Sequence, residues 1–121
     1  MGVPDIPTMV ALTSASNLRA AVTELGGRNA TTSNPSWPVA VIGGAVHSAQ
    51  GSPAWRLSWS GWRGGVVPVR LGEVPTEESA LPLSPAVAAA ACIAEAFACH
   101  AGDHRMAGRR TAGLSLWMPG R

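Results

Sequence analysis

The alternation of apolar and polar positions first indicates a short helix near the amino terminus. Within residues 14–25, apolar side chains recur at three- and four-residue intervals, which is the spacing of one helix face. Thr13 or Ser14 precedes this pattern and can cap its first turn, and the pair Gly26 and Gly27 ends it. We therefore expect a helix over residues 14–25.

A longer helical pattern, rich in alanine, spans residues 84–101. Ser84 suits the N-cap, and Pro85 at the first helical position loses no intrahelical hydrogen bond. Gly102 follows the pattern and is expected to end the helix. The sequence therefore predicts a second helix whose small side chains allow a close approach to a sheet.

The bulky residues of this second helix predict which of its faces is buried. Ile93 and Phe97 lie four residues apart and share one side, whereas Glu95 lies almost opposite. We expect Ile93 and Phe97 to pack in the core and Glu95 to face water.

Four further stretches show strand-like patterns. Trp55, Leu57 and Trp59 alternate with polar residues, which places them on one face of a half-buried strand. Gly64 and Gly65 interrupt a second stretch and indicate a bulge or turn there. The four expected strands lie near residues 39–44, 55–60, 62–70 and 112–117.

Together these elements predict an α/β fold, a small mixed sheet with the two helices packed on it. Residues 71–83 contain three Glu and two Pro and are expected to form an exposed connector. The 121 residues suit one small domain over 1–121. We divide it into an N-terminal arm, helix and loop over 1–38, and the sheet with its alanine-rich helix over 39–121.

The composition excludes a disordered chain and argues against nucleic acid as a partner. Hydrophobic residues make up 46% of the chain and charged residues only 13%, the reverse of what disorder requires. The nine basic residues are all Arg, give a net charge of +2 and are scattered along the sequence instead of forming one patch. The low charge and the five Trp favour a protein partner or self-association.

The cysteines and the N-terminus indicate a cytoplasmic protein that does not bind membranes. Cys92 and Cys99 lie seven residues apart in one helical pattern, about 10.5 Å along the axis, which is too far for a disulfide. Two free thiols suit a reducing compartment. No signal-peptide pattern is visible, and the longest apolar run, residues 86–94, is shorter than the ~20 residues of a membrane span.

Candidate metal ligands gather where the second helix ends. Cys99, His100 and His104 carry donor types that bind zinc, and Asp103 lies between the two histidines. On a helix, however, Cys99 and His100 point about 100° apart, and Gly102 separates His100 from His104. A thiol packed in the core beside a histidine at a helix C-terminus is the simpler interpretation, so we assign no metal. A metal-dependent enzyme using Cys99, His100 and His104 stays open as an alternative.

No nucleotide-binding loop is evident in the sequence. Gly43 and Gly44 follow an expected strand, but the next residues lead into a Ser-Gly-Pro loop and not into a helix that could hold phosphate. The serines also lack the strand-to-helix context of a catalytic nucleophile. We therefore expect no catalytic residue and no cofactor.

Three motifs follow one another along the second half of the chain. They are WRLSWSGWRGGVVPV over 55–69, PLSPAVAAAACIAEAF over 82–97 and AGRRTAGLSLW over 107–117. In this order they resemble the region just before the nucleotide-binding domain of bacterial ThiF-like, ubiquitin-activating-enzyme-like adenylyltransferase-family proteins. The resemblance covers residues 55–117, about half of the chain. The family's Gly-rich loop has no match here, so no catalytic residue is carried over.

The resemblance implies a non-catalytic structural or interaction module that flanks an adenylyltransferase-like domain. The alternative is a stand-alone binding module with a pocket beside Gly43, Gly44 and the turn at Gly61. The contact surface is expected near the last strand, at Trp62, Leu114, Leu116 and Trp117.

Overall fold

A computed structural model describes residues 13–32, 34–43, 53–69, 77–78 and 81–118. The chain divides into two compact units, Met1–Asn34 and Pro35–Arg121.

The first unit contains helix α1, Leu18–Glu24, which ends before Gly26 as expected. Its N-cap is Asn17, whose side-chain oxygen accepts a hydrogen bond from the backbone N–H of Ala20 at 2.9 Å. The expected cap at Thr13 or Ser14 is therefore wrong. Both hydroxyls instead donate to the carboxylate of Glu24, at 2.8 and 3.0 Å. These hydrogen bonds lower the pKa of Glu24.

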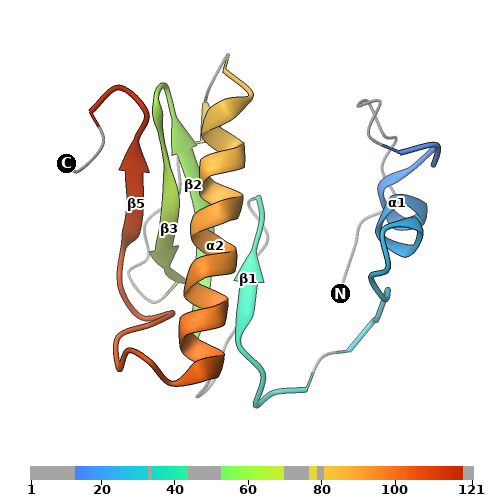
Figure 1. The fold of residues 1–121 in the computed structure, drawn as a ribbon. Helices are drawn as coiled ribbons and strands as arrows, with labels where there is room; N and C mark the ends of the chain where they lie inside the picture. Colours follow the sequence, from blue (N-terminus) through green and yellow to red (C-terminus); the bar gives the residue numbers. More distant parts are fainter. Residues whose placement is uncertain (1–12, 33, 44–52, 70–76, 79–80, 119–121) are drawn as a thin grey trace. The chain divides into compact units, whose positions relative to one another are not determined.

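The second unit is built on a five-stranded mixed sheet, which confirms the α/β class (Figure 1). The main path runs in the order β1-β2-β3-β5; β1 is parallel to β2, whereas β3 is antiparallel to both β2 and β5. A short strand, β4, pairs in parallel with the end of β2. The strands are β1 Val39–Val41, β2 Ala54–Ser60, β3 Arg63–Pro68, β4 Glu77–Glu78 and β5 Ala112–Ser115.

All four expected strands are present, and three of them are shorter than the patterns suggested. The first ends at Val41, and Gly44 lies outside the described residues. The connector expected over 71–83 contains β4, a strand that the sequence patterns did not indicate. A strand of two residues shows no detectable alternation, and only its pairing with β2 defines it.

Gly61 and Trp62 form the two-residue turn between β2 and β3, since Ser60 pairs with Arg63. Gly61 has φ +55, as the first position of such a hairpin turn favours. Gly64 and Gly65, in contrast, continue the regular ladder, so the expected bulge or turn is wrong.

Only glycine fits at position 64, because a helix backbone lies directly against it. A Cβ at Gly64 would stand 2.8 Å from the backbone nitrogen of Ala88 and 3.0 Å from Cβ of Val87. Such contacts are too short for any side chain. The glycine therefore sets the approach of helix to sheet.

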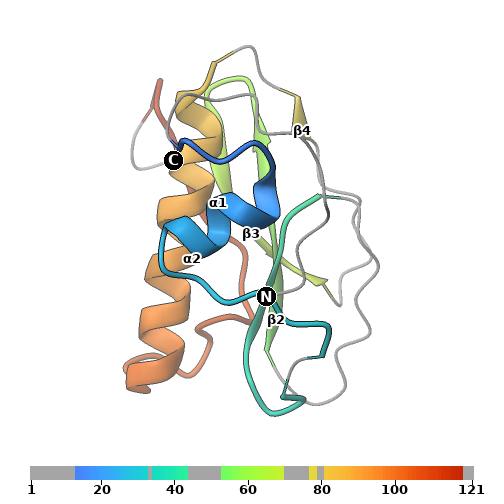
Figure 2. The ribbon, with the colours of Figure 1, turned by 90° about the vertical axis from the view of Figure 1, so that its right-hand side faces the viewer.

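That helix is α2, Leu83–Ala101, which lies along one face of the sheet (Figure 2). It ends at Gly102, in the left-handed conformation, as predicted. Ser84 does not cap it, because the helix already begins at Leu83 and Pro82 occupies the cap position without a side-chain bond. The hydroxyl of Ser84 instead donates to the carbonyl of Gly61 and holds the first turn of α2 to the hairpin.

The core between α2 and the sheet consists of large side chains from the strands and small ones from the helix. Trp55 is 1% exposed and packs with Leu57, Val66 and Ala88. The indole nitrogen of Trp55 lies 3.2 Å from Sγ of Cys92, to which it donates a hydrogen bond. Because Trp55 fills this space from the sheet side, the helix can contribute only small residues.

The buried face of α2 is therefore the reverse of the expected one. Glu95 is 3% exposed, whereas Ile93 and Phe97 are both 70% exposed. The expectation ranked side chains by size, but the glycine-lined strand and Trp55 leave no room for Ile93 or Phe97. Glu95 is tolerated inside because Arg110 supplies an opposite charge.

By length and hydropathy alone, α2 could cross a bilayer, which the sequence interpretation did not expect. In this fold its inner face packs on the sheet and carries the ion pair of Glu95. Leaving the sheet would expose Trp55, Leu57 and Val66 to water. The inner face of α2 thus belongs to the core of the domain, although only 17% of the apolar window of this helix is buried in the described structure.

Candidate protein-interaction site

Strand β5 lies at one end of the sheet and is a candidate contact edge. Among the described strands it pairs only with β3, in a register that joins Arg63 to Ser115 and Val66 to Ala112. Its other edge has no strand partner in the described part of the chain. Unpaired backbone groups on such an edge readily accept another strand.

Two tryptophans lie together where β5 meets the hairpin turn. The ring centroids of Trp62 and Trp117 are 6.0 Å apart, with ring planes tilted by 50°. The backbone N–H of Leu116 donates to the carbonyl of Trp62 at 2.7 Å, which ties the two segments together. Trp62 is 45% exposed and Trp117 74% exposed. The pair is thus held in place and still open to solvent.

Other apolar side chains extend this surface, which we call the tryptophan edge. Leu114 is exposed and Leu116 is half-buried. Both residues belong to the contact surface that was predicted from the sequence. Met118 is also exposed and was missed, because it follows the expected strand. The tryptophan edge comprises Trp62, Leu114, Leu116, Trp117 and Met118.

The segment that leads into β5 is anchored to α2 by a buried carboxylate. Glu95 accepts hydrogen bonds from Arg110, at 2.7 and 3.0 Å, and from the backbone N–H of Gly108 at 2.8 Å. Burial raises the pKa of Glu95, but the bonds from Arg110 and Gly108, with the nearby charges of Arg110 and His104, hold it below its ordinary value. The pKa of Arg110 is raised by the same partner. This anchor positions the chain just before the tryptophan edge.

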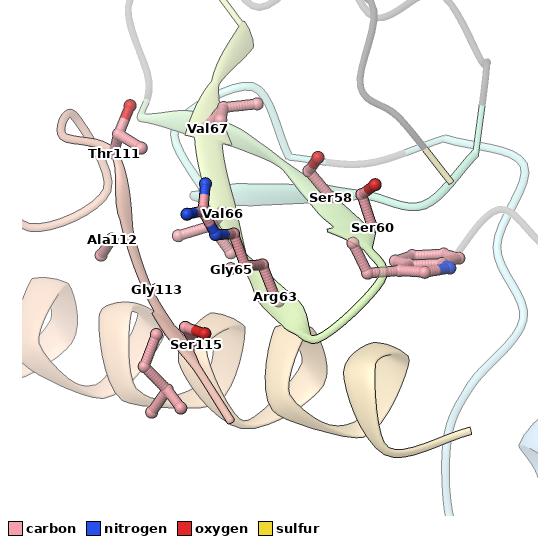
Figure 3. Close-up of a pocket in the computed structure, with 13 residues that line it drawn as sticks. Ser58, Ser60, Arg63, Gly65, Val66, Val67, Thr111, Ala112, Gly113 and Ser115 are labelled. Atoms are coloured by element: carbon pink, nitrogen blue, oxygen red, sulfur yellow. The ribbon is translucent and has the colours of Figure 1, made fainter. Parts of the chain in front are cut away.

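The opposite face of the sheet carries a shallow hollow of about 480 Å³. Ser58 and Ser60 project into it on the side away from α2, and Gly65 and Gly113 leave its floor without side chains (Figure 3). Arg63 contributes a positive charge. This hollow, which we call the serine hollow, is not the pocket expected by Gly43, Gly44 and Gly61, since neither Gly43 nor Gly61 lines it; Gly44 lies outside the described residues.

The residues considered for zinc are spread over two elements. Cys99 is half-buried and His100 exposed in the last turn of α2, whereas His104 lies in the following loop. The ring Nδ1 of His104 accepts from the backbone N–H of Met106 at 3.1 Å. Within the described ranges, no three metal-binding side chains come together.

Comparison with known proteins places this domain in the N-terminal region of bacterial E1-like proteins. The family model of the BilD N-terminal domain matches residues 1–116, so the chain belongs to the BilD N-terminal domain family. The bacterial E1-like protein BilD of Collimonas sp. (strain OK412) is 46% identical over 120 residues, which cover 99% of this chain.

Those residues make up 26% of the Collimonas protein, so the chain spans about a quarter of that relative's length. The match includes residues 1–54, which the three motifs did not cover. No solved structure matches the chain. The E1-like N-terminal assignment is thus shown by sequence, and the fold is described here from the chain itself.

Proposed function

We propose that the chain is a non-catalytic docking module of an E1-like protein of the ThiF-like adenylyltransferase family. Its tryptophan edge would bind the remaining part of the E1-like polypeptide. The observation that carries this proposal is the exposed Trp62–Trp117 pair beside the free edge of β5. Tryptophan, with tyrosine and arginine, is enriched among the residues that contribute most of the binding energy at protein interfaces.

The geometry of α2 supports the non-catalytic part of the proposal. A nucleotide site of the kind that adenylyl transfer needs would use free backbone N–H groups at a helix N-terminus. Here the first turn of α2 is packed onto the hairpin through Ser84 and Gly61, and Gly64 lies against its backbone. Little space is left for phosphate at this end of the helix.

The length of the Collimonas protein indicates which partner the tryptophan edge would bind. Because about three quarters of the Collimonas protein lie outside the matched region, a domain of this family has a large neighbour in at least one relative. The free edge of β5 offers backbone pairing, while the tryptophans offer apolar contact. Together they suit a folded domain more than a small ligand.

Binding to the rest of an E1-like protein tests the proposal directly. The part of the Collimonas relative outside the matched residues is expressed separately, and titration calorimetry measures its affinity for this chain. Trp117→Ala and Trp62→Ala should each weaken binding by about 10-fold or more, as buried aromatic anchors do. Trp37→Ala is the matched control, since Trp37 is 61% exposed and precedes β1 at another part of the sheet.

Equal losses from Trp37→Ala and Trp117→Ala would contradict the assigned surface. The control is the region of the Collimonas protein that is 46% identical to this chain, which should bind the rest of the Collimonas protein. If that control binds and this chain does not, the docking role is contradicted. In that case the stand-alone binding module becomes the better hypothesis. Its candidate site is the serine hollow, where Arg63 and two serines could hold a small anionic ligand.

A further inference from the structure

The backbone of β5 turns every second residue toward the open edge of the sheet. The N–H of Leu116 donates to the carbonyl of Trp62, so Leu116 faces the hairpin side. In an antiparallel ladder, residues that bond to the neighbouring strand alternate with residues that face away from it. Because β5 pairs with β3 in one continuous register, the residues that face away are Gly113 and Ser115. Each presents an N–H and a carbonyl group to the side of β5 that has no strand partner in the described part of the chain.

The sequence of β5 lacks the features by which edge strands normally avoid pairing. Proline, bulges, charged side chains and very short strands serve that purpose. β5 carries no charged residue and no proline, and its register with β3 is unbroken. At the other end of the sheet, β1 has only three residues and directly follows Pro38. The edge of β5 is therefore the better suited of the two to accept another strand.

The serine hollow places a positive charge beside this edge. The side chain of Arg63 extends over the hollow beside Gly65, on the face of the sheet away from α2 (Figure 3). Arg63 forms no ion pair with any residue that the structure describes. Gly113 pairs with Gly65 and has no side chain that would separate the guanidinium from the open edge. An added strand would lie two strand spacings, about 10 Å, from β3, and the long side chain of Arg63 and a carboxylate on that strand can together bridge this distance.

The face of β5 that is turned toward α2 is apolar. Leu114 pairs with Gly64, which lies against the backbone of α2, so Leu114 belongs to the helix-covered face. Leu116 follows two residues later and lies on the same face. Leu114 is 44% exposed and is thus open to a neighbour beyond β5. A strand beside β5 would meet apolar side chains on this face and a positive charge on the opposite face.

We propose that an extended segment of the remaining E1-like polypeptide adds to the sheet as a strand beside β5. Its acidic side chains lie on the face of the serine hollow, and its apolar side chains lie on the face of α2. This inference rests on the proposed docking function and specifies the form of the partner. A strand pairs with the outward N–H and carbonyl groups of Gly113 and Ser115, and such main-chain bonds supply affinity while the alternating side chains supply specificity. A large neighbour is available in at least one relative, since the matched residues make up only 26% of the Collimonas protein.

Hydrogen exchange at single amides distinguishes an added strand from other modes of docking. The probe is the part of the Collimonas protein outside the matched residues, and NMR follows the amides of this chain. The amides of Gly113 and Ser115 should exchange about 10-fold more slowly or less in the complex, because they become hydrogen-bonded. Ala40 is the matched control: the N–H of Val39 donates to Pro53, so the N–H of Ala40 faces the opposite edge of the sheet and should exchange at an unchanged rate.

Removal of one outward N–H tests the same contact by substitution. Proline is tolerated on an edge strand where the N–H faces away from the ladder. Ser115→Pro should weaken binding to the Collimonas fragment by about 10-fold, since it removes a main-chain donor from the interface. Ser115→Ala is the control, because it removes the hydroxyl and keeps the N–H, and it should change the affinity much less. Circular dichroism checks that both variants are folded.

Substitution of Arg63 tests the acidic face of the added strand. Arg63→Gln should weaken binding by about 5-fold and reduce its dependence on salt, because the carboxylate loses its charged partner. Arg105→Gln, at an exposed arginine in the loop after α2, should change neither the affinity nor its salt dependence. Equal effects of the two substitutions would overturn the acidic face.

Binding of the fragment that leaves the exchange of Gly113 and Ser115 unchanged would overturn the added strand and leave the docking function in place. Equal affinities of folded Ser115→Pro and Ser115→Ala would overturn it in the same way. The exchange measurement uses the unsubstituted chain, so it decides the question even where Ser115→Pro does not fold. Absence of binding, with the Collimonas control intact, would overturn the docking function and the strand together.

Discussion

Glu95, in the middle of α2, is joined to Arg110 by an ion pair of 2.7 Å across fifteen residues of sequence. The carboxylate is almost completely buried, whereas the guanidinium is partly open to solvent. The backbone N–H of Gly108 provides a further hydrogen bond to the same carboxylate. One side chain thus fixes the loop that leads from α2 into β5 and the tryptophan edge.

Removal of Arg110 should destabilise the domain markedly. Arg110→Ala leaves a buried carboxylate with only Gly108 as a donor, so we expect the free energy of unfolding to fall clearly, although less than for a fully buried pair. Arg105→Ala, at an exposed arginine of the same loop, should change it by less than about 0.5 kcal/mol. Urea unfolding at neutral pH measures both values. Similar values for the two variants would argue against the anchor.

The same pair predicts a loss of stability in acid. Because the pKa of Glu95 is lower in the folded chain than its ordinary value of 4.5, its contribution is complete above that value and is lost as the pH falls through the folded-state pKa. Glu95→Gln should therefore reduce the free energy of unfolding at pH 7. The difference in this free energy between the variant and the wild-type chain should become smaller by pH 3. The pKa of Glu24 is also lowered, so Glu24 adds to the loss of stability in acid. It does so equally in the wild-type chain and in the Glu95→Gln variant. A gap that stays constant with pH would refute the assignment.

Two bulky residues should show opposite sensitivities to truncation. Trp55→Ala removes the largest core side chain and should cost about 3–5 kcal/mol. Phe97→Ala should cost less than about 0.5 kcal/mol, because Phe97 is mostly exposed. Urea unfolding at low micromolar concentration gives both values. A large loss for Phe97→Ala would restore the face predicted from the sequence.

Substitution of Gly64 and of Gly61 by alanine should reduce stability by different amounts and for different physical reasons. Gly64→Ala places a methyl group against the backbone of α2 and should cost about 3 kcal/mol or more. Gly61→Ala meets open space and pays only for its positive φ, roughly 1–2 kcal/mol. Thermal unfolding of the two variants should rank them in this order, and the reverse order would show that α2 does not lie against β3.

The sequence predicted the type and approximate place of both helices and of four strands, but it did not predict the helix N-caps, strand β4 or the tertiary pairing. The alternation of Trp55, Leu57 and Trp59 predicted β2, and Gly102 predicted the end of α2. The orientation of α2 was predicted wrongly, because it depends on Arg110 and Gly64, which lie far from Glu95 in sequence.

The candidate site shows the same division. Trp62 and Trp117 were singled out by residue type and by their place in the motifs, but their mutual contact depends on the pairing of β3 with β5. Met118 carried no signal of its own beyond being apolar. The serine hollow was missed because Ser58, Arg63 and Gly113 come from three strands and meet only in the folded sheet.

The isolated chain is finally expected not to bind Mg-ATP. The sequence lacks a Gly-rich loop that leads into a helix, and the first turn of α2 is engaged by the hairpin through Ser84 and Gly61. Titration calorimetry with Mg-ATP should give no heat beyond dilution, and the full-length Collimonas relative, measured alongside, shows whether the rest of an E1-like protein supplies the site. Micromolar binding by the chain itself would contradict the non-catalytic proposal. Attention would then return to Gly43, whose positive φ after β1 is the remaining candidate for a phosphate-binding turn.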